Sequence, residues 1–314
     1  MCANLLAAKG TPVIETLESR QLIALDGGDP VVRGTYHRAP DGCPACVGEA
    51  EGSSRVGILF LNSLTLPRAA TGDSSVYWAD AFARCGYPSF RIDLPGLGDT
   101  EGELPLDVLH FINSGEFASV IARVVAELGK RFDLAGVVIV GHCAGAVSAI
   151  YAAAATPGCQ GLVLMDPYFH LRQAVRPWIR EQMSAWARRS SVGRTCGKVY
   201  DRLGDLWLRM QGNQVPRNAN SPLLRAWKQV AESGLPILLL KAPGLKAPGV
   251  KPRPGEFDYV RYVVGLAKRK SRVSVIAVEG TDHSFANRTG REAICRHTET
   301  WLATHFPVAS SVPR

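Results

Sequence analysis

The order of apolar and polar positions along the chain predicts strands that alternate with helices. Short apolar runs that indicate buried strands lie at residues 56–61, 89–93, 137–140, 161–166, 235–240 and 273–278. Apolar residues recur at helical spacing at residues 75–84, 116–131, 146–150, 256–267 and 288–305. Because parallel neighbours need a crossover that is usually a helix, we expect an α/β fold with a mostly parallel, doubly wound sheet.

The N-terminal region predicts a different kind of pairing. Alternating apolar stretches lie at residues 12–17, 22–25 and 32–36. This alternation predicts two or three antiparallel strands at one edge of the sheet. The loop that follows contains Cys43 and Cys46, but no second ligand pair at a matching spacing comes after them. We therefore interpret these two cysteines as loop residues and expect no metal site.

A cationic, tryptophan-rich segment interrupts the alternation after residue 167. From there to about residue 232 the apolar spacing is helical, and the segment holds four tryptophans. A helical segment inserted between two strands of a sheet is typical of a lid. We therefore predict an α/β core in two parts, residues 1–167 and 233–314, with a helical cap at residues 168–232.

The composition is that of a globular protein with one large core. The chain has 314 residues, of which 46% are apolar and 20% charged. No run approaches the roughly 18 apolar residues of a membrane span, and residues 1–9 lack the basic stretch that begins a signal peptide. The eight cysteines follow no framework spacing, which suits a reducing compartment. We expect a cytoplasmic protein.

The net charge of +8 is concentrated in the predicted cap. Residues 170–230 hold ten Arg and two Lys against three acids, so the rest of the chain is close to neutral. A solvated helical face explains such a charge, and so does an anionic substrate or partner. No nucleic-acid-binding motif accompanies the charge, so we expect no nucleic acid as a partner.

One strand ends in a pattern that carries chemistry. The run at 137–140 is followed by Gly141–Gly145, which reads Gly-His-Cys-Ala-Gly, and an alanine-rich helical pattern begins at once. This is the G-x-S-x-G nucleophile elbow, with Cys143 in the place of the usual serine. Glycines flank the nucleophile because the turn is strained and the neighbouring backbone crowds it. The pattern resembles the α/β-hydrolase superfamily.

A cysteine nucleophile needs a base, and that base needs an orienting group. His283 is the best candidate of the seven histidines, because it follows the last predicted strand, where α/β-hydrolases place theirs. The positive end of the helix that begins beside Cys143 also favours its thiolate. His142 lies inside the elbow and points away from the reaction, so we expect it to pack or hydrogen-bond below the site.

The orienting acid is less clear from the sequence. Most of the superfamily carry it after the strand read here at 235–240, but residues 241–249 contain no acid. Asp166 ends the preceding strand, where the thioesterase domains of peptide and polyketide synthases carry their acid. We favour Asp166, with Asp258 at the start of a helix as the alternative. Asp282 is third, because a neighbour of the histidine in sequence usually faces away from it.

The oxyanion hole is predicted from the same elbow. Its first donor is the backbone N–H of Ala144, and its second comes from the loop after the strand at 56–61. The sequence leaves Ser63 and Leu64 as equal candidates for the second donor. The loop at 93–102 also looks like the D-x-x-G-x-G-x-S-x-G loop of α/β-hydrolases, with Thr100 in the usual serine place.

The resemblance to α/β-hydrolases extends from about residue 22 to residue 306. Asp99–Gly102, Gly141–Cys143 and Gly280–Phe285 look like the serine-aminopeptidase-like branch, in which exosortase-associated hydrolases also carry an elbow cysteine. The elbow and Met165–Tyr168 also resemble thioesterases.

The resemblance implies an acyl hydrolase or acyltransferase that works through a Cys143 acyl-enzyme and needs no cofactor. A cysteine favours acyl transfer, since a thioester is activated towards amines and thiols. The cationic cap would suit an acyl group carried on phosphopantetheine, coenzyme A or an acidic carrier protein. Two alternatives stay open: a binding protein on a degenerate hydrolase scaffold, and a lactone hydrolase of the dienelactone type, which also uses an elbow cysteine.

Overall fold

A single sheet of eight strands runs through the described part of the chain. The computed structural model describes residues 19–40, 55–171, 215, 218–242, 258–267 and 272–308. The strands lie in the order β1-β2-β4-β3-β5-β6-β7-β8. Their bounds are β1 Arg20–Leu25, β2 Val32–His37, β3 Val56–Leu61, β4 Ser89–Ile92, β5 Gly136–His142, β6 Cys159–Met165, β7 Pro236–Lys241 and β8 Arg272–Ala277. β1 pairs antiparallel with β2 and β2 with β4, and every other pairing among them is parallel.

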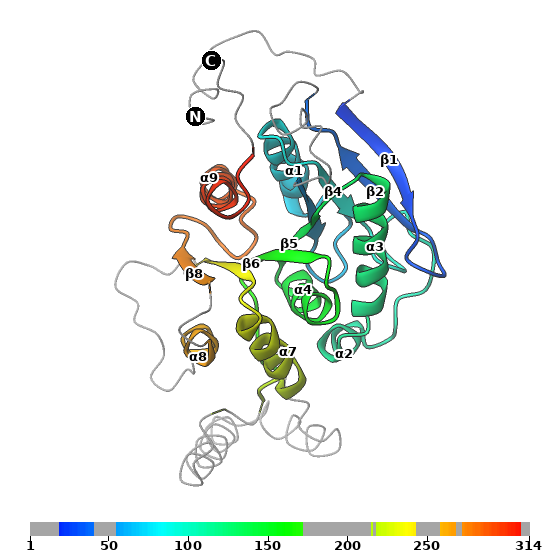
Figure 1. Cartoon of the computed structure of the whole chain (residues 1–314). Coiled ribbons are helices and arrows are strands. Elements are labelled where there is room, and N and C mark those ends of the chain that lie inside the picture. The colour runs from blue at the N-terminus through cyan, green and yellow to red at the C-terminus, as the bar shows by residue number, and fades with distance from the viewer. Residues whose placement is uncertain are drawn as a thin grey trace, which may run out of the picture.

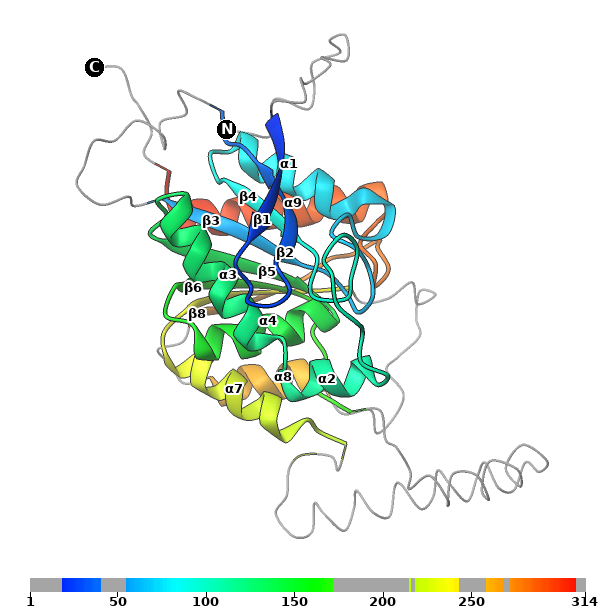
Figure 2. The same cartoon turned by 90° about the vertical axis from the view of Figure 1, so that its right-hand side faces the viewer.

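Helices cover both faces of this sheet (Figure 1, Figure 2). α1 (Ser74–Arg84) and α9 (Arg288–His305) lie on one face. α3 (Ala118–Arg131), α4 (Ala144–Ala155) and α7 (Ser221–Glu232) lie on the other, with the shorter helices α2 (Val108–Ser114) and α8 (Tyr259–Leu266). The predicted α/β-hydrolase fold with a mostly parallel, doubly wound sheet is confirmed.

Alternate side chains of the central strands fill two separate cores. In β5, Val137 and Ile139 belong to the core under α3, α4 and α7, and Val138 and Val140 belong to the core under α1 and α9. The strand therefore has no polar face, which explains why its sequence is a continuous apolar run. β3, β6 and β7 alternate in the same way.

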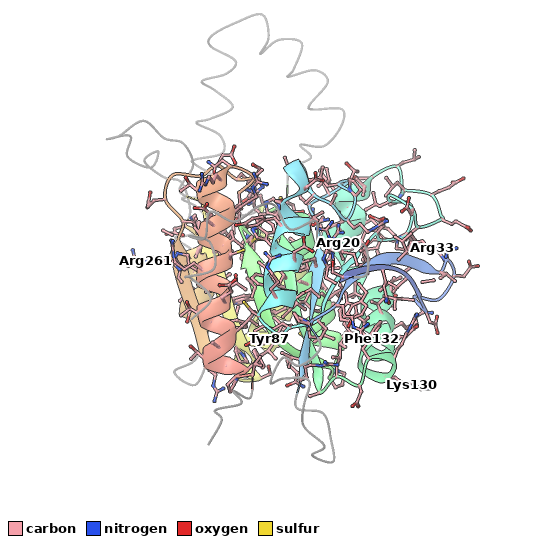
Figure 3. The ribbon with its side chains drawn as sticks, turned by 90° about the horizontal axis from the view of Figure 1, so that it is seen from above. Arg20, Arg33, Tyr87, Lys130, Phe132 and Arg261 are labelled. Atoms are coloured by element: carbon pink, nitrogen blue, oxygen red, sulfur yellow. The ribbon has the colours of Figure 1, made fainter. Side chains whose placement is uncertain are left out.

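The N-terminal hairpin of β1 and β2 forms one edge of the sheet, as predicted. The third stretch predicted there, residues 12–17, lies outside the described residues. Seen from above, exposed Arg33 of β2 lies across the molecule from exposed Arg261 of α8 (Figure 3).

Most of the predicted cap, residues 168–232, lies outside the described residues. Residues 172–214, 216 and 217 lie outside the described part, as do Cys43 and Cys46, so the cap stays a prediction. The last helix of that range, α7, packs on α4, and Leu223 and Trp227 are fully buried in the core. No single described helix is long and apolar enough to cross a membrane, although the bent pair α2 and α3 reaches that length and composition together.

Candidate active site

The residues singled out in the sequence gather at the carboxyl ends of the parallel strands. Ser63 follows β3, Cys143 follows β5, Asp166 follows β6 and His283 follows β8. The ends of parallel strands meet at one edge of a sheet, which is where ligands of open α/β sheets bind. Residues as far apart in sequence as Ser63 and His283 therefore lie at the same edge of the sheet.

The elbow at Cys143 has a strained backbone. Cys143 has φ 52° and ψ −109°, a conformation that L-residues rarely adopt, and α4 begins at the next residue. A Cβ on Gly145 would lie 2.1 Å from the carbonyl oxygen of Leu61, and one on Gly141 would lie 2.6 Å from Cα of Ala146. The turn can form because the residues two positions before and two positions after Cys143 are both glycine.

His283 and Asp166 form an ion pair beside this elbow. His283 Nδ1 lies 2.8 Å from Asp166 Oδ2, and the backbone N–H of Ala242 donates to Asp166 Oδ1 at 3.1 Å. The Asp166 side chain is 14% exposed and that of His283 is 58% exposed. The carboxylate is therefore fixed from both sides, while the imidazole is open to water.

The thiol of Cys143 is partly buried and has three hydrogen-bond partners: the side chains of His283 and Ser63 and the backbone of Ala144. Burial raises the pKa of the thiol, but the hydrogen bonds and the charge of His283 outweigh burial, so its pKa is below the ordinary value. Hydrogen bonds to Asp166 and Cys143 raise the pKa of His283 to about 10. Both shifts favour a thiolate next to an imidazolium.

The two other candidate acids make local contacts instead. Asp258 is exposed, and its side chain accepts the backbone N–H of Arg261 at 3.0 Å as the N-cap of α8. Asp282 accepts hydrogen bonds from the backbone and hydroxyl of Ser284. Asp166 is thus the candidate whose carboxylate meets His283.

The candidates for the oxyanion hole lie around the sulfur. The hydroxyl of Ser63 and the backbone of Ala144 both contact Cys143, and Leu64 follows with a φ of 42°. The loop after β3, which carries both candidates, lies against the elbow, since the carbonyl oxygens of Leu61 and Asn62 face Gly145. Among the described residues, no group of three or more His, Cys, Asp or Glu could hold a metal ion.

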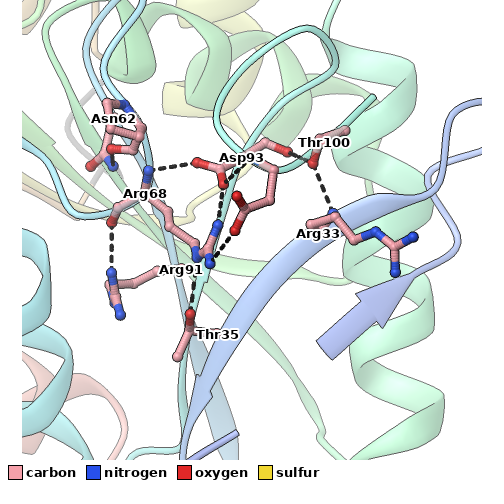
Figure 4. A network of polar contacts seen from close by, with 9 residues as sticks. Arg33, Thr35, Asn62, Arg68, Arg91, Asp93 and Thr100 are labelled. Atoms are coloured by element: carbon pink, nitrogen blue, oxygen red, sulfur yellow. Dashed lines mark hydrogen bonds and ion pairs between the residues drawn. The ribbon is translucent and has the colours of Figure 1, made fainter. Parts of the chain in front are cut away.

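An arginine that sequence reasoning missed holds the loop after β3. The backbone N–H of Arg68 donates to Asp93 Oδ1 at 2.6 Å, and its guanidinium pairs with Asp93 and with Asp99. Arg68 Nε donates to Thr35, and Arg91 donates to the carbonyl of Arg68 at 3.0 Å (Figure 4). No motif marks this arginine, because its partners come from β2, β4 and the loop after β4.

Fold and elbow together define an α/β-hydrolase, and a comparison with family models agrees. The model described as the alpha/beta hydrolase family matches residues 58–296. The chain belongs to the alpha/beta hydrolase family, and the prediction of an enzyme of this class is confirmed. No curated protein matches the sequence.

Several solved structures share the fold at low sequence identity. Dienelactone hydrolase from Anabaena variabilis is 17% identical, with a TM-score of 0.54 over 92% of this chain and 99% of that one. An esterase from Pyrococcus furiosus is 12% identical, with a TM-score of 0.59 over 93% and 94% of the two chains. The α/β-hydrolase GrgF from a Penicillium species is 14% identical, with a TM-score of 0.55 over 91% and 99%. At these identities the likeness concerns the fold.

Proposed function

We propose that the protein is an acyl hydrolase or acyltransferase of the thioesterase type, with Cys143 as nucleophile, His283 as base and Asp166 as the orienting acid. The observation that carries this proposal is one line of contacts, from the Asp166 carboxylate through the imidazole of His283 to the Cys143 thiol. It is the arrangement that covalent catalysis by an activated thiol requires.

The reaction proceeds through an acyl-enzyme. The thiolate of Cys143 attacks an ester or thioester carbonyl, a C–S bond forms, and the carbonyl electron pair moves to oxygen. The N–H of Ala144 and a donor from Ser63 or Leu64 hold this oxyanion. The carbonyl then re-forms, and the leaving group takes the proton from His283 as its bond breaks. Water or another acceptor gives a proton back to His283 and attacks the acyl-enzyme, which releases Cys143 as thiolate.

The acyl carrier is proposed to be anionic. Residues 170–230 have ten Arg and two Lys against three acids, which would favour the phosphates of coenzyme A or phosphopantetheine, or an acidic carrier protein. Salt tests this part separately, since attraction between exposed charges is screened. We expect KM for an acyl-coenzyme A to rise with ionic strength. A constant KM would contradict the proposal of an anionic carrier but would not affect the proposal of an acyl-enzyme.

Intact-mass spectrometry with a p-nitrophenyl ester tests the acyl-enzyme. We expect one acyl adduct on the wild type and none on Cys143→Ala. Cys159→Ala is the matched control, because it removes a buried thiol of β6 whose pKa burial raises to about 12. Loss of the adduct in this control, or an adduct on Cys143→Ala, would contradict the mechanism. A wild type that forms no adduct would favour the alternative of a binding protein on a hydrolase scaffold.

A lactone hydrolase of the dienelactone type is the second candidate. The elbow cysteine favours it, and dienelactone hydrolase is among the proteins of similar fold. Both candidates use the Cys143 acyl-enzyme, so the substrate separates them. Relative kcat/KM for an acyl-coenzyme A and an unsaturated lactone decides which one holds.

A further inference from the structure

The side chain next to the nucleophile has no part in the proposed reaction. His142 ends β5, is 5% exposed, and comes directly before Cys143. Its Nε2 lies 2.7 Å from the carbonyl oxygen of His283, which is 141 residues away in sequence. The two imidazole rings lie 5.2 Å apart, and Phe285 packs edge-on against His142 from the same loop.

The contact defines where the proton of His142 resides. A carbonyl oxygen only accepts hydrogen bonds, so Nε2 of His142 carries the hydrogen and donates it. Burial, the largest influence, lowers the pKa of His142 to about 4, and the groups that act on it are His283, Asp166 and Asp282. His142 therefore stays neutral above about pH 5, and the same nitrogen donates in every protonation state of His283.

We infer that His142 is a positioning residue for the catalytic base: it holds the backbone of His283 so that the imidazole reaches the Cys143 sulfur. This inference rests on the proposed function. The hydrogen bond joins the elbow to the loop that carries the base. Asp166 fixes one side of the ring at Nδ1, and His142 fixes the chain from which the ring extends. Two anchors leave the other nitrogen facing the thiol.

The inference has a consequence for the thiol that needs no substrate. Without the anchor, His283 would spend less time in contact with the sulfur. The thiolate would lose its nearest cation, so the pKa of Cys143 would rise. A buried residue that fills space without holding His283 would leave this pKa unchanged.

The experiment is the pH dependence of iodoacetamide alkylation at Cys143, followed by peptide mass spectrometry. His142→Leu removes the donor and keeps the bulk, and His142→Gln keeps an N–H donor at a similar reach. We expect the inflection for His142→Leu to lie about one pH unit above that of the wild type, with alkylation about tenfold slower below both inflections. His142→Gln should recover most of this change. The buried Cys159 of β6 is the internal control, because its alkylation would increase only if the fold opened.

The outcomes separate this inference from the proposed function. A wild-type inflection below that of a free thiol, unchanged in His142→Leu, would overturn the positioning role and leave the reactive thiolate intact. A wild-type inflection at the value of a free thiol would overturn the thiolate itself. If His142→Leu does not fold, imidazole NMR of the wild type decides, since a proton on Nδ1 instead of Nε2 would contradict the inferred hydrogen bond.

Discussion

Two histidine–aspartate pairs in this molecule have nearly the same geometry and opposite properties. His283 Nδ1 lies 2.8 Å from Asp166, and His37 Nδ1 lies 2.6 Å from Asp80. The His283 side chain is 58% exposed and the His37 side chain 1%. Hydrogen bonds raise the pKa of His283 to about 10, whereas burial lowers the pKa of His37 despite its contact with Asp80.

The second ring nitrogen explains the difference in use. Nε2 of His37 accepts a hydrogen bond from Nε of Arg91 at 2.7 Å, so it cannot take a proton without losing that bond. The imidazole of His283, in contrast, interacts with a thiol that can give up its proton. A histidine–aspartate pair therefore indicates a base only when the free nitrogen faces a proton donor and water can reach it. The predictions below test this division into a reactive pair and a structural pair.

The largest effect is expected for Asp166→Asn. The amide keeps the shape but loses the charge that orients and stabilises the imidazolium, so we expect kcat/KM to fall by about 10³- to 10⁴-fold. The thermal midpoint should change little, because the site is partly open to water. Turnover of the ester identified by the adduct experiment measures the loss. Asp258→Asn is the matched control, and an equal loss in that variant would contradict the assignment of the acid.

A large loss of stability, without loss of activity per folded molecule, is expected for Asp80→Ala. Asp80 binds both Arg20 and His37, and its removal leaves Nδ1 of the buried His37 without this acceptor. Leaving a buried N–H donor without its acceptor typically costs about 1 to 3 kcal/mol, which urea unfolding measures. Glu103→Ala, at an exposed acid, controls for a simple change of charge. A stable Asp80→Ala protein with an inactive thiol would reverse the roles of the two pairs.

The fold was more predictable from sequence than the site. β3 and α9 match the predicted ranges residue for residue, because a doubly buried strand is a continuous apolar run and a long amphipathic helix repeats its spacing. The short helix α2 was not predicted, since Ile112 is its one buried side chain and seven residues show little periodicity. The type and bounds of an element can be predicted from its pattern of buried apolar residues, and a short exposed element has no such pattern.

Within the site, order along the chain predicted the elbow and the histidine loop but left three candidate acids, Asp166, Asp258 and Asp282. Asp258 precedes a helix, and an aspartate there is a common N-cap, a signal that the sequence contains. The contacts of Arg68 and of the His37–Asp80 pair could not be predicted from the sequence. His37 and Asp80 are 43 residues apart and belong to no motif. Pairs of this kind depend on how elements pack.

A moderate effect on the rate is expected for Arg68→Lys. Lysine keeps the charge beside Asp93 but cannot bind Asp93, Asp99 and Thr35 at once, so the loop that carries Ser63 and Leu64 should loosen. We expect kcat to fall about tenfold with little change in KM, since the oxyanion forms in the transition state. Steady-state kinetics measure this split.

Arg33→Lys is the matched control for the Arg68 variant. Its backbone N–H, rather than its side chain, donates to Thr100 in the same network (Figure 4). A change confined to KM in Arg68→Lys, or an equal fall of kcat in Arg33→Lys, would mean that the loop is not held for the oxyanion.

The smallest effect concerns the pH dependence of stability, and it isolates the structural pair. The pKa of His37 is lowered in the folded protein, so the unfolded chain takes up more protons as the pH falls below about 6.5. His37 therefore adds stability above that pH, and the addition is lost on acidification. His37→Gln can still donate to Asp80 and accept from Arg91. Between pH 7 and pH 5 it should therefore lose less stability than the wild type in urea unfolding. Part of the pH dependence should persist in this variant, because burial also lowers the pKa of His142. The control is His110→Gln, at an exposed histidine of α2, which should behave as the wild type. An unchanged dependence in His37→Gln would mean that His37 can accept a proton in the folded state, which would remove the contrast between the two pairs.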